Sequence, residues 1–278
     1  MASIDALRLG MNLHQGTTTS QLNYLQASRI THVRYTAYMD QIMSAGPYQV
    51  QFYVDMQTFR GRGLKVMLVF HEMPPGDPYG DSLNLPQVIV NTIFPDPHYG
   101  GPIKPINDIV IAVQLGNENN VDNPSFTPYL HGGTAYARGQ SHGNQIVAIR
   151  QALDARAGGS AIQVWTTGVA GQDGVPNPAV PVQDFFNGVL SVPGVDTALR
   201  GLCVHCYGYP PDHQLRDFGR AANQACLARG VSIPIYSTEV GSEKLASGTA
   251  DAESDGALQV QNALYWLSEA GPRQIRWG

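Results

Sequence analysis

The sequence predicts an α/β protein built as a single (β/α)8 TIM barrel, and three observations carry that prediction. Short apolar runs rich in β-branched residues alternate with longer segments of helical periodicity, which indicates parallel βαβ units. Eight such runs follow one another along the chain. The length of 278 residues fits the roughly 250 residues that eight strand–helix units need. We therefore assign residues 1–278 to a single (β/α)8 domain.

The apolar runs give the predicted strands. Several are almost continuously apolar, such as residues 66–70 and 109–113, which is typical of strands covered on both faces. No G-x-G-x-x-G motif follows the first strand, so a closed barrel is favoured over an open dinucleotide-binding sheet. The predicted strands are Leu7–His14, Ile30–Tyr38, Leu64–Glu72, Ile109–Glu118, Ala161–Ala170, Leu199–Tyr207, Ser232–Val240 and Arg273–Trp277.

The segments between the strands are predicted to be helices and loops. Gln145–Arg156 and Asp255–Ala270 carry apolar residues at helical spacing. Met73–Asn107 is a long connection rich in proline and glycine, with one helix around Pro86–Phe94. Because this connection follows the third strand, we expect it to lie over the active face of the barrel. The chain ends at Gly278, directly after the eighth strand, so we expect the barrel to lack its last outer helix.

Composition narrows the range of partners. Only 14% of the residues are charged and the net charge is -5, which gives no electrostatic reason to expect nucleic acid or an anionic membrane as a partner. No apolar run approaches the roughly 18 residues of a membrane span. The first residues do not form a basic region followed by an apolar one, so we expect no signal peptide in this chain.

The cysteines do not indicate a metal or redox centre. The chain has 3 cysteines, and Cys203 and Cys206 form a lone CxxC pair within a predicted strand. An offset of three in a strand puts the two side chains on opposite faces, and zinc sites usually need four ligands. We therefore predict neither a metal nor a cofactor.

Polar residues concentrate where the predicted strands end. In (β/α)8 enzymes the chemistry lies at the carboxyl ends of the strands, and a core strand has no structural need for these residue types. The strand-end residues are Asn12, His14, Arg34, His71, Glu72, Asn117, Glu118, His205, Tyr207, Glu239 and Trp277. A buried glutamate is rare unless it is paired or functional, so Glu118 and Glu239 are the candidate catalytic pair.

Two of these stretches resemble motifs of a known enzyme family. Leu115-Gly116-Asn117-Glu118 and Ser237-Thr238-Glu239-Val240-Gly241 resemble the acid/base and nucleophile motifs of the large clan of retaining (β/α)8 glycosidases. The chain is most similar to the cellulase family, family 5 of the glycoside hydrolases. That family also has Arg, His, His-x-Tyr and Trp at the ends of strands two, three, six and eight, where this chain has Arg34, His71, His205, Tyr207 and Trp277. Many members have proline after the acid/base glutamate, whereas this chain has Asn119, which leaves the substrate open.

The resemblance implies a retaining hydrolase of a β-linked oligo- or polysaccharide. Glu118 would be the acid/base and Glu239 the nucleophile, because glycoside hydrolysis needs two carboxyl groups flanking the bond. Arg34, His71, Asn117, His205, Tyr207 and Trp277 would bind the substrate or orient its neighbours. This substrate class favours an extracellular location. The sugar, the linkage and the oligomeric state stay open.

Other hypotheses compete with this one. Arg34 could be a structural ion-pair residue, the two histidines could be ordinary core residues, and Trp277 could simply cap the core. A catalytically weak or inactive carbohydrate-binding protein could use the same barrel, since fold does not fix function. A metal-dependent hydrolase could use His14 with His71 and His205. A serine hydrolase is not expected, because the chain has no G-x-S-x-G motif.

Overall fold

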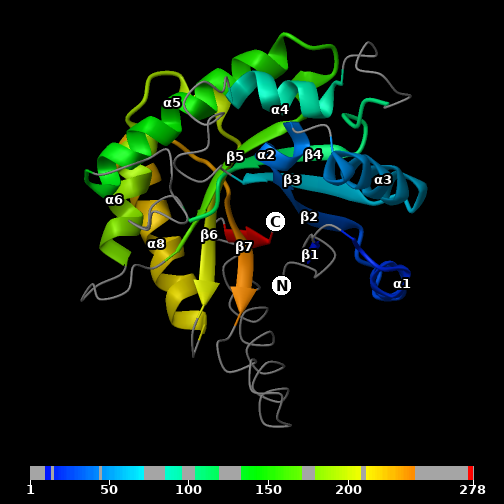
Figure 1. The fold of residues 1–278 in the computed structure, drawn as a ribbon. Coiled ribbons are helices and arrows are strands. Elements are labelled where there is room, and N and C mark those ends of the chain that lie inside the picture. The colour runs from blue at the N-terminus through cyan, green and yellow to red at the C-terminus, as the bar shows by residue number, and fades with distance from the viewer. Residues whose placement is uncertain are drawn as a thin grey trace.

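A curved sheet of eight parallel strands, in the order β1 to β8, lies at the centre of the structure (Figure 1). This computed structural model describes residues 10–13, 16–43, 46–71, 85–95, 104–118, 133–170, 179–207, 211–241 and 275–277. The strands are β1 Gly10–Leu13, β2 His32–Tyr38, β3 Lys65–His71, β4 Val110–Leu115, β5 Gln163–Val169, β6 Gly201–Tyr207, β7 Ile235–Gly241 and β8 Ile275–Trp277. Each strand pairs with the next one along the chain, which confirms the predicted (β/α)8 fold class.

Every predicted strand overlaps an observed one, but the ends differ: the predicted Ser232–Val240, for example, begins three residues before β7 begins and ends one residue before β7 ends. The predicted Ile109–Glu118 is too long, because β4 ends at Leu115 and the following residues form a bend. The predicted Ala161–Ala170 begins too early, because Gly159–Ala161 forms a short 3-10 helix, η2. The expectation about a last outer helix concerns chain beyond the described residues.

The helices lie on the outer, convex side of the sheet (Figure 1). The predicted helix Pro86–Phe94 is confirmed as α4, whereas Asp255–Ala270 lies outside the described residues. Within the described ranges, none of the helices combines the length and the apolar character that crossing a membrane requires. The helices are α1 Thr19–Ala27, α2 Met39–Met43, α3 Pro47–Gly61, α4 Leu85–Ile93, α5 Ala135–Asp154, α6 Ala179–Leu190, α7 Val195–Ala198 and α8 Pro211–Arg229.

Helix α5 corrects the predicted helix Gln145–Arg156, because it begins ten residues earlier, at Ala135. Thr134 caps it by accepting a hydrogen bond from a backbone N–H of the first turn. The first half carries glycines, which weaken the helical signal. Their role is packing: a Cβ on Gly139 would overlap the backbone carbonyl of Phe185 on α6. The two helices approach too closely for any larger residue there.

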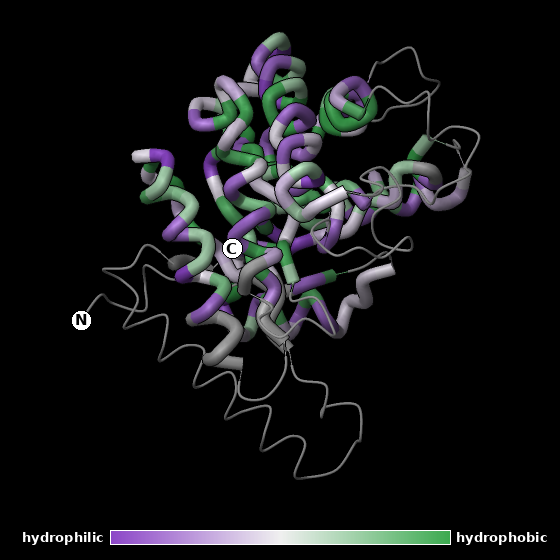
Figure 2. The backbone as a smooth tube through the Cα atoms, turned by 90° about the vertical axis from the view of Figure 1, so that its left-hand side faces the viewer, coloured by the Kyte–Doolittle hydropathy of each residue, from purple (hydrophilic) through white to green (hydrophobic). Residues whose placement is uncertain are grey.

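Two separate apolar clusters hold the fold together. The larger one fills the space between the convex face of the sheet and the helices, and its wholly buried side chains include Tyr35, Phe52 and Phe59. The smaller one lies inside the curve of the sheet and consists of Met67, Ala112, Trp165 and Cys203. Figure 2 shows hydrophobic and hydrophilic residues interspersed along the helices, as expected for helices with one buried face. The sheet is therefore covered by side chains on both faces.

Candidate active site

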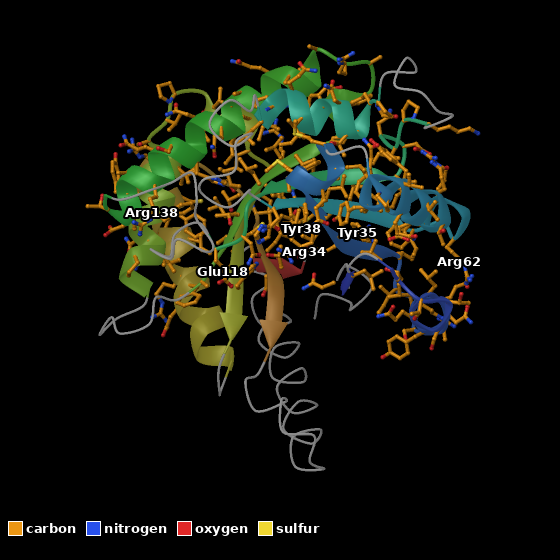
Figure 3. The ribbon with its side chains drawn as sticks, in the orientation of Figure 1. Arg34, Tyr35, Tyr38, Arg62, Glu118 and Arg138 are labelled. Carbon is orange, nitrogen blue, oxygen red and sulfur yellow. The ribbon has the colours of Figure 1, made fainter. Side chains whose placement is uncertain are left out.

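Arg34 reaches from β2 into the space inside the curve of the sheet and holds two amide side chains (Figure 3). Its Nε donates to Oε1 of Gln114 at 3.4 Å, and its Nη2 donates to Oδ1 of Asn117 at 3.1 Å. Arg34 is only 8% exposed, and Gln114 is wholly buried. A guanidinium is a planar, rigid donor. Asn117 is thus held with its carbonyl oxygen toward Arg34, which leaves the amide NH2 as the end that can donate to a ligand.

Glu118 follows in the bend after β4, in a backbone conformation that glycine usually adopts. Its φ is 55° and that of Gly116 is 73°. A non-glycine residue in this left-handed region costs about 1–2 kcal/mol. The backbone N–H of Glu118 donates to the carbonyl of Gly168 on β5 at 2.9 Å. Strain of this kind persists where surrounding structure enforces it, and it clusters at functional sites.

The Glu118 carboxyl contacts His205, which brings two of the predicted site residues together. Nδ1 of His205 lies 3.0 Å from Oε1 of Glu118. The imidazole is wholly buried, while the Glu118 side chain is 17% exposed. The contact holds Oε1 of a carboxyl group that is still partly exposed. This is the arrangement that an acid/base residue needs, because its proton must reach a ligand in one defined direction.

A β-bulge in β5 determines which residue of that strand lies beside His205. Trp165 and Gly168 lie three residues apart on β5, whereas their partners Gly201 and Cys203 lie two apart on β6. One extra residue is therefore accommodated in β5. A bulge of this kind changes which residues of a strand face its partner. As a result, glycine occupies the register position of Cys203, where a regular strand would put the preceding threonine.

The glycine at that position is required by the imidazole. A Cβ added to Gly168 would overlap the His205 ring. No rotation of a larger side chain can avoid this overlap, because the Cβ position is fixed by the backbone. Gly168 thus supplies two things to the site: the carbonyl that anchors Glu118 and the space that His205 fills.

A second bulge sets the register of Glu239. Val204 and His205 are consecutive on β6, but their partners Ser237 and Glu239 skip Thr238 on β7. The backbone of Glu239 thereby pairs with His205, the residue that contacts Glu118. The side chain of Glu239 lies outside the described part of the structure. At the level of the backbone, the two predicted glutamates flank the same histidine.

His71 lies at the end of β3 beside an aromatic residue that sequence reasoning did not single out. His71 pairs in register with Tyr38 of β2, and their ring centroids lie 5.3 Å apart. The backbone N–H of Tyr38 donates to the hydroxyl of Tyr48 on α3 at 3.2 Å. The rings of Tyr38 and His71 are both partly exposed. Together they form an aromatic pair at the carboxyl ends of β2 and β3.

Four further predicted strand-end residues are described only in part or not at all. Tyr207 pairs in register with Gly241, and Trp277 with Ser237, so their backbones lie on β6 and β8. Their side chains, and all of His14 and Glu72, lie outside the described residues. Within the described ranges, no three His, Cys, Asp or Glu side chains gather as metal ligands would.

The smaller apolar cluster, which contains Trp165 and Cys203, lies beneath these polar groups inside the curve of the sheet. Trp165 stacks on Tyr236 with centroids 4.1 Å apart and planes 10° from parallel. Cys203 is wholly buried beside them, and burial raises the pKa of its thiol to about 12. A thiol of this kind stays protonated at neutral pH and is a poor nucleophile. The polar side chains described above, and not the Cys203 thiol, are therefore the groups available for chemistry.

Sequence reasoning missed three residues that shape this site, namely Gln114, Gly168 and Tyr38. A signal existed for Gln114, since it is a single amide in the apolar run of residues 109–115. Gly168 interrupts another strand, and glycine inside a strand often marks a bulge or a close approach. Tyr38 gave no signal of its own, because an aromatic residue is ordinary in a strand.

Comparisons with known proteins show what this architecture is similar to. The sequence matches no model of a protein family, and the search of curated proteins found no match. The structure is similar to that of a family 51 α-L-arabinofuranosidase from Bifidobacterium longum, with a TM-score of 0.61 and 12% identity over 98% of this chain and 66% of that one. A fungal β-1,4-galactanase matches with a TM-score of 0.64 and 12% identity over 98% of this chain and 89% of that one.

An endoglucanase from Thermobifida fusca is similar as well. Its catalytic domain, determined in complex with cellotetraose, matches with a TM-score of 0.54 and 16% identity over 98% of this chain and 77% of that one. Structural similarity at sequence identities of 12% to 16% shows the fold but does not show the activity. The chain has the (β/α)8 barrel fold that these glycoside hydrolases share.

Proposed function

We propose that this protein is a retaining glycoside hydrolase of β-linked glycans, with Glu118 as acid/base and Glu239 as nucleophile. The contact between Glu118 and His205 is the observation that supports this most, because Glu239 pairs in register with the same histidine. Two carboxyl-bearing residues then flank one point at the carboxyl ends of β4 and β7. The likeness in fold to glycoside hydrolases adds to the argument.

In the first step, Glu239 attacks the anomeric carbon and the glycosidic C–O bond breaks. Glu118 gives its proton to the departing oxygen, and a covalent glycosyl–enzyme ester forms. Because Oε1 of Glu118 is engaged by His205, the proton to be transferred is carried on Oε2. His205 thus decides which oxygen of the carboxyl group faces the leaving group.

In the second step, Glu118 acts as a base. Its carboxylate takes a proton from water, the water oxygen attacks the anomeric carbon, and the bond to Glu239 breaks. Two inversions give net retention at the anomeric carbon. Oε2 of Glu118 donates a proton in the first step and accepts one in the second. This follows because the second step is the chemical reverse of the first, with water in place of the leaving group.

The residues around the pair hold the sugar. Arg34 orients Asn117, whose amide NH2 donates to the sugar 2-hydroxyl, a contact that strengthens in the transition state. His71 with Tyr38, and Tyr207 with Trp277, provide hydroxyl-binding and ring-stacking groups around it. A glycan polymer is too large to enter cells, so we place this activity outside the cell.

The first experiment measures reducing-sugar release from mannan, cellulose, xylan and mixed-linkage glucans. The wild type is compared with Glu118→Gln and Glu239→Ala, and with Asp196→Asn as an exposed acidic control. Activity on one polymer that is lost in both glutamate variants and kept in the control supports the proposal. Activity that persists in both glutamate variants contradicts the assigned roles.

Azide rescue separates the two roles. With Glu239→Ala, azide should replace the missing nucleophile and give a glycosyl azide of inverted configuration. With Glu118→Ala, azide should attack the glycosyl–enzyme ester and give a product of retained configuration. A crystal structure should place the two carboxyl groups about 5–5.5 Å apart, whereas about 6.5–9.5 Å would mean an inverting enzyme.

The competing functions give different results in the same assays. A carbohydrate-binding protein without catalytic activity would bind one of the polymers tightly and release no sugar. A metal-dependent hydrolase would lose its activity on treatment with a chelator, while the proposed enzyme would keep it.

A further inference from the structure

His142 is a wholly buried histidine on α5, and it contacts the backbone of β5. Its Nε2 accepts a hydrogen bond from the backbone N–H of Thr167 at 3.0 Å. Its ring lies against Phe185 of α6, with centroids 5.6 Å apart. Burial lowers its pKa to about 3. The imidazole is therefore neutral at ordinary pH and keeps the lone pair that accepts this bond.

This hydrogen bond satisfies a backbone N–H group at the bulge in β5. The extra residue of a bulge leaves backbone groups without a partner in the ladder, and a buried N–H without a partner costs about 1–3 kcal/mol. Side chains satisfy two such groups here: His142 accepts from Thr167 N–H, and Thr166 Oγ1 accepts from Cys203 N–H at 2.8 Å. The bulge is thus held from the outer helix as well as from within the sheet.

The peptide held by His142 leads directly into the candidate site. Thr167 is followed by Gly168, whose carbonyl accepts from Glu118 N–H at 2.9 Å. The Cα of the same glycine leaves the space that His205 occupies. A shift of this short segment would therefore move the anchor of Glu118 and the wall beside His205 together.

We propose that His142 is a positioning residue, which fixes the Thr167–Gly168 segment and through it the orientation of the Glu118 carboxyl group. The part of this proposal that concerns proton transfer by Glu118 rests on the proposed function. The part that concerns the geometry of the Glu118–His205 contact does not.

The histidine satisfies one buried backbone group and leaves one of its own ring atoms without a partner among the described residues. With Nε2 accepting, the hydrogen of the neutral ring is on Nδ1, and this buried atom has no hydrogen-bond partner among the residues that the structure describes. An apolar side chain of similar size would avoid this unsatisfied N–H but would remove the acceptor for Thr167. The acceptor is retained where it supports the bulge.

Three variants and a control test the proposal. His142→Gln keeps an acceptor at a similar distance, since its Oε1 can replace Nε2. His142→Leu and His142→Met remove the acceptor, and using both guards against one failing to fold. Ile146→Ala is the control, because Ile146 is wholly buried one turn further along α5 and its truncation loosens packing without touching the bulge.

The first readout needs no substrate. The imidazole ¹⁵N resonances of His205, identified by their loss in His205→Gln, report its contact with Glu118. They should shift in His142→Leu and His142→Met, and stay near the wild-type values in His142→Gln and Ile146→Ala. Unchanged His205 resonances in both acceptor-free variants would overturn the proposal.

The second readout is the dependence of kcat/KM on the leaving group of aryl glycosides, because kcat/KM reports the first step alone, whereas kcat also contains the second step, in which Glu118 is the base. Dinitrophenolate departs without a proton, whereas a poor leaving group needs the proton from Glu118. A general acid contributes about 10²–10⁴-fold, so partial misplacement should lower kcat/KM about tenfold on the poor leaving group and hardly at all on dinitrophenolate. An equal loss on both substrates would mean that His142 is only structural.

The two readouts keep the two proposals apart. A wild type that hydrolyses no glycoside would refute the proposed function. The His205 resonances alone would then decide whether His142 positions the Glu118–His205 pair.

Discussion

Gly168 on β5 and His205 on β6 compete for one volume, and the missing side chain of the glycine is what admits the imidazole. An added Cβ would overlap the His205 ring, while the ring lies 3.0 Å from the Glu118 carboxyl. Steric fit between two strands therefore determines where the candidate acid/base group is held.

Gly168→Ala should displace His205 and lower activity at least about 100-fold, because misplacement of about 1 Å can cost that much. Urea denaturation should also show a loss of a few kcal/mol, as overpacking typically costs about 1–3 kcal/mol. Gly61→Ala is the matched control. It lies at the end of α3 with open space around it, where alanine should be neutral or stabilising. Wild-type activity in Gly168→Ala would show that His205 does not need this position.

Arg34→Lys should lower kcat/KM about 10–100-fold, because one ammonium group cannot hold both Gln114 and Asn117 in the planar geometry of the guanidinium. Steady-state kinetics checks this. The control is Arg62→Lys, since Arg62 directly follows α3 and donates to the exposed side chains of Asn23 and Gln26 on α1 (Figure 3). If Arg34→Lys and Arg62→Lys behave alike, Arg34 has no role in orienting the site.

Tyr35→Phe should destabilise the fold by about 1–3 kcal/mol with little effect on activity, since it leaves a buried carboxylate short of one donor. The Tyr35 hydroxyl donates to Oδ2 of Asp55 at 2.6 Å. Burial and this hydrogen bond hold the pKa of Tyr35 well above its ordinary value, so it remains a donor. Tyr53→Phe is the control, because its hydroxyl donates to a neutral carbonyl. Equal losses in free energy of unfolding would contradict a special role of the carboxylate.

His142 should make stability depend on pH in the acidic range. Its pKa is about 3 when folded, against an ordinary value of 6.5, so the unfolded chain takes up a proton first as the pH falls. The stabilisation is fully present above pH 6.5 and is lost as the pH falls from there toward 3, with a slope approaching about 1.4 kcal/mol per pH unit. Urea denaturation between pH 4 and 7 should show this slope as the difference between wild type and His142→Gln. Parallel curves for the two proteins would refute it.

The fold was predictable because its signals are local. Each strand carries a run of apolar, β-branched residues, and the end of the strand carries the polar residues. The assignment of Arg34, Asn117, Glu118 and His205 to one site followed from that placement. The structure brings Arg34 to Asn117 and Glu118 to His205, and their roles in a site stay a prediction.

The bulges were not predictable in the same way. Gly168 inside a strand was a signal for a bulge or a close approach, but it does not say which neighbouring strand the register shifts against. The skip before Glu239 has no such signal, because Ser237, Thr238 and Glu239 are all polar and give no alternation to break. His142 was missed for a related reason. It lies in the half of α5 whose glycines hide the helix, and its partner is a backbone group, which has no sequence signature.

The register shifts also limit what a substitution can change. In β4, β5 and β7 the described strand holds one residue more than the spacing of its neighbour requires, so the residues facing that neighbour change from odd to even numbers, or the reverse, partway along. A substitution exchanges one side chain and adds no residue to a strand, so this parity belongs to the backbone. Substitutions on the inner face can therefore vary the groups that meet a ligand while His205 and Glu239 keep their register.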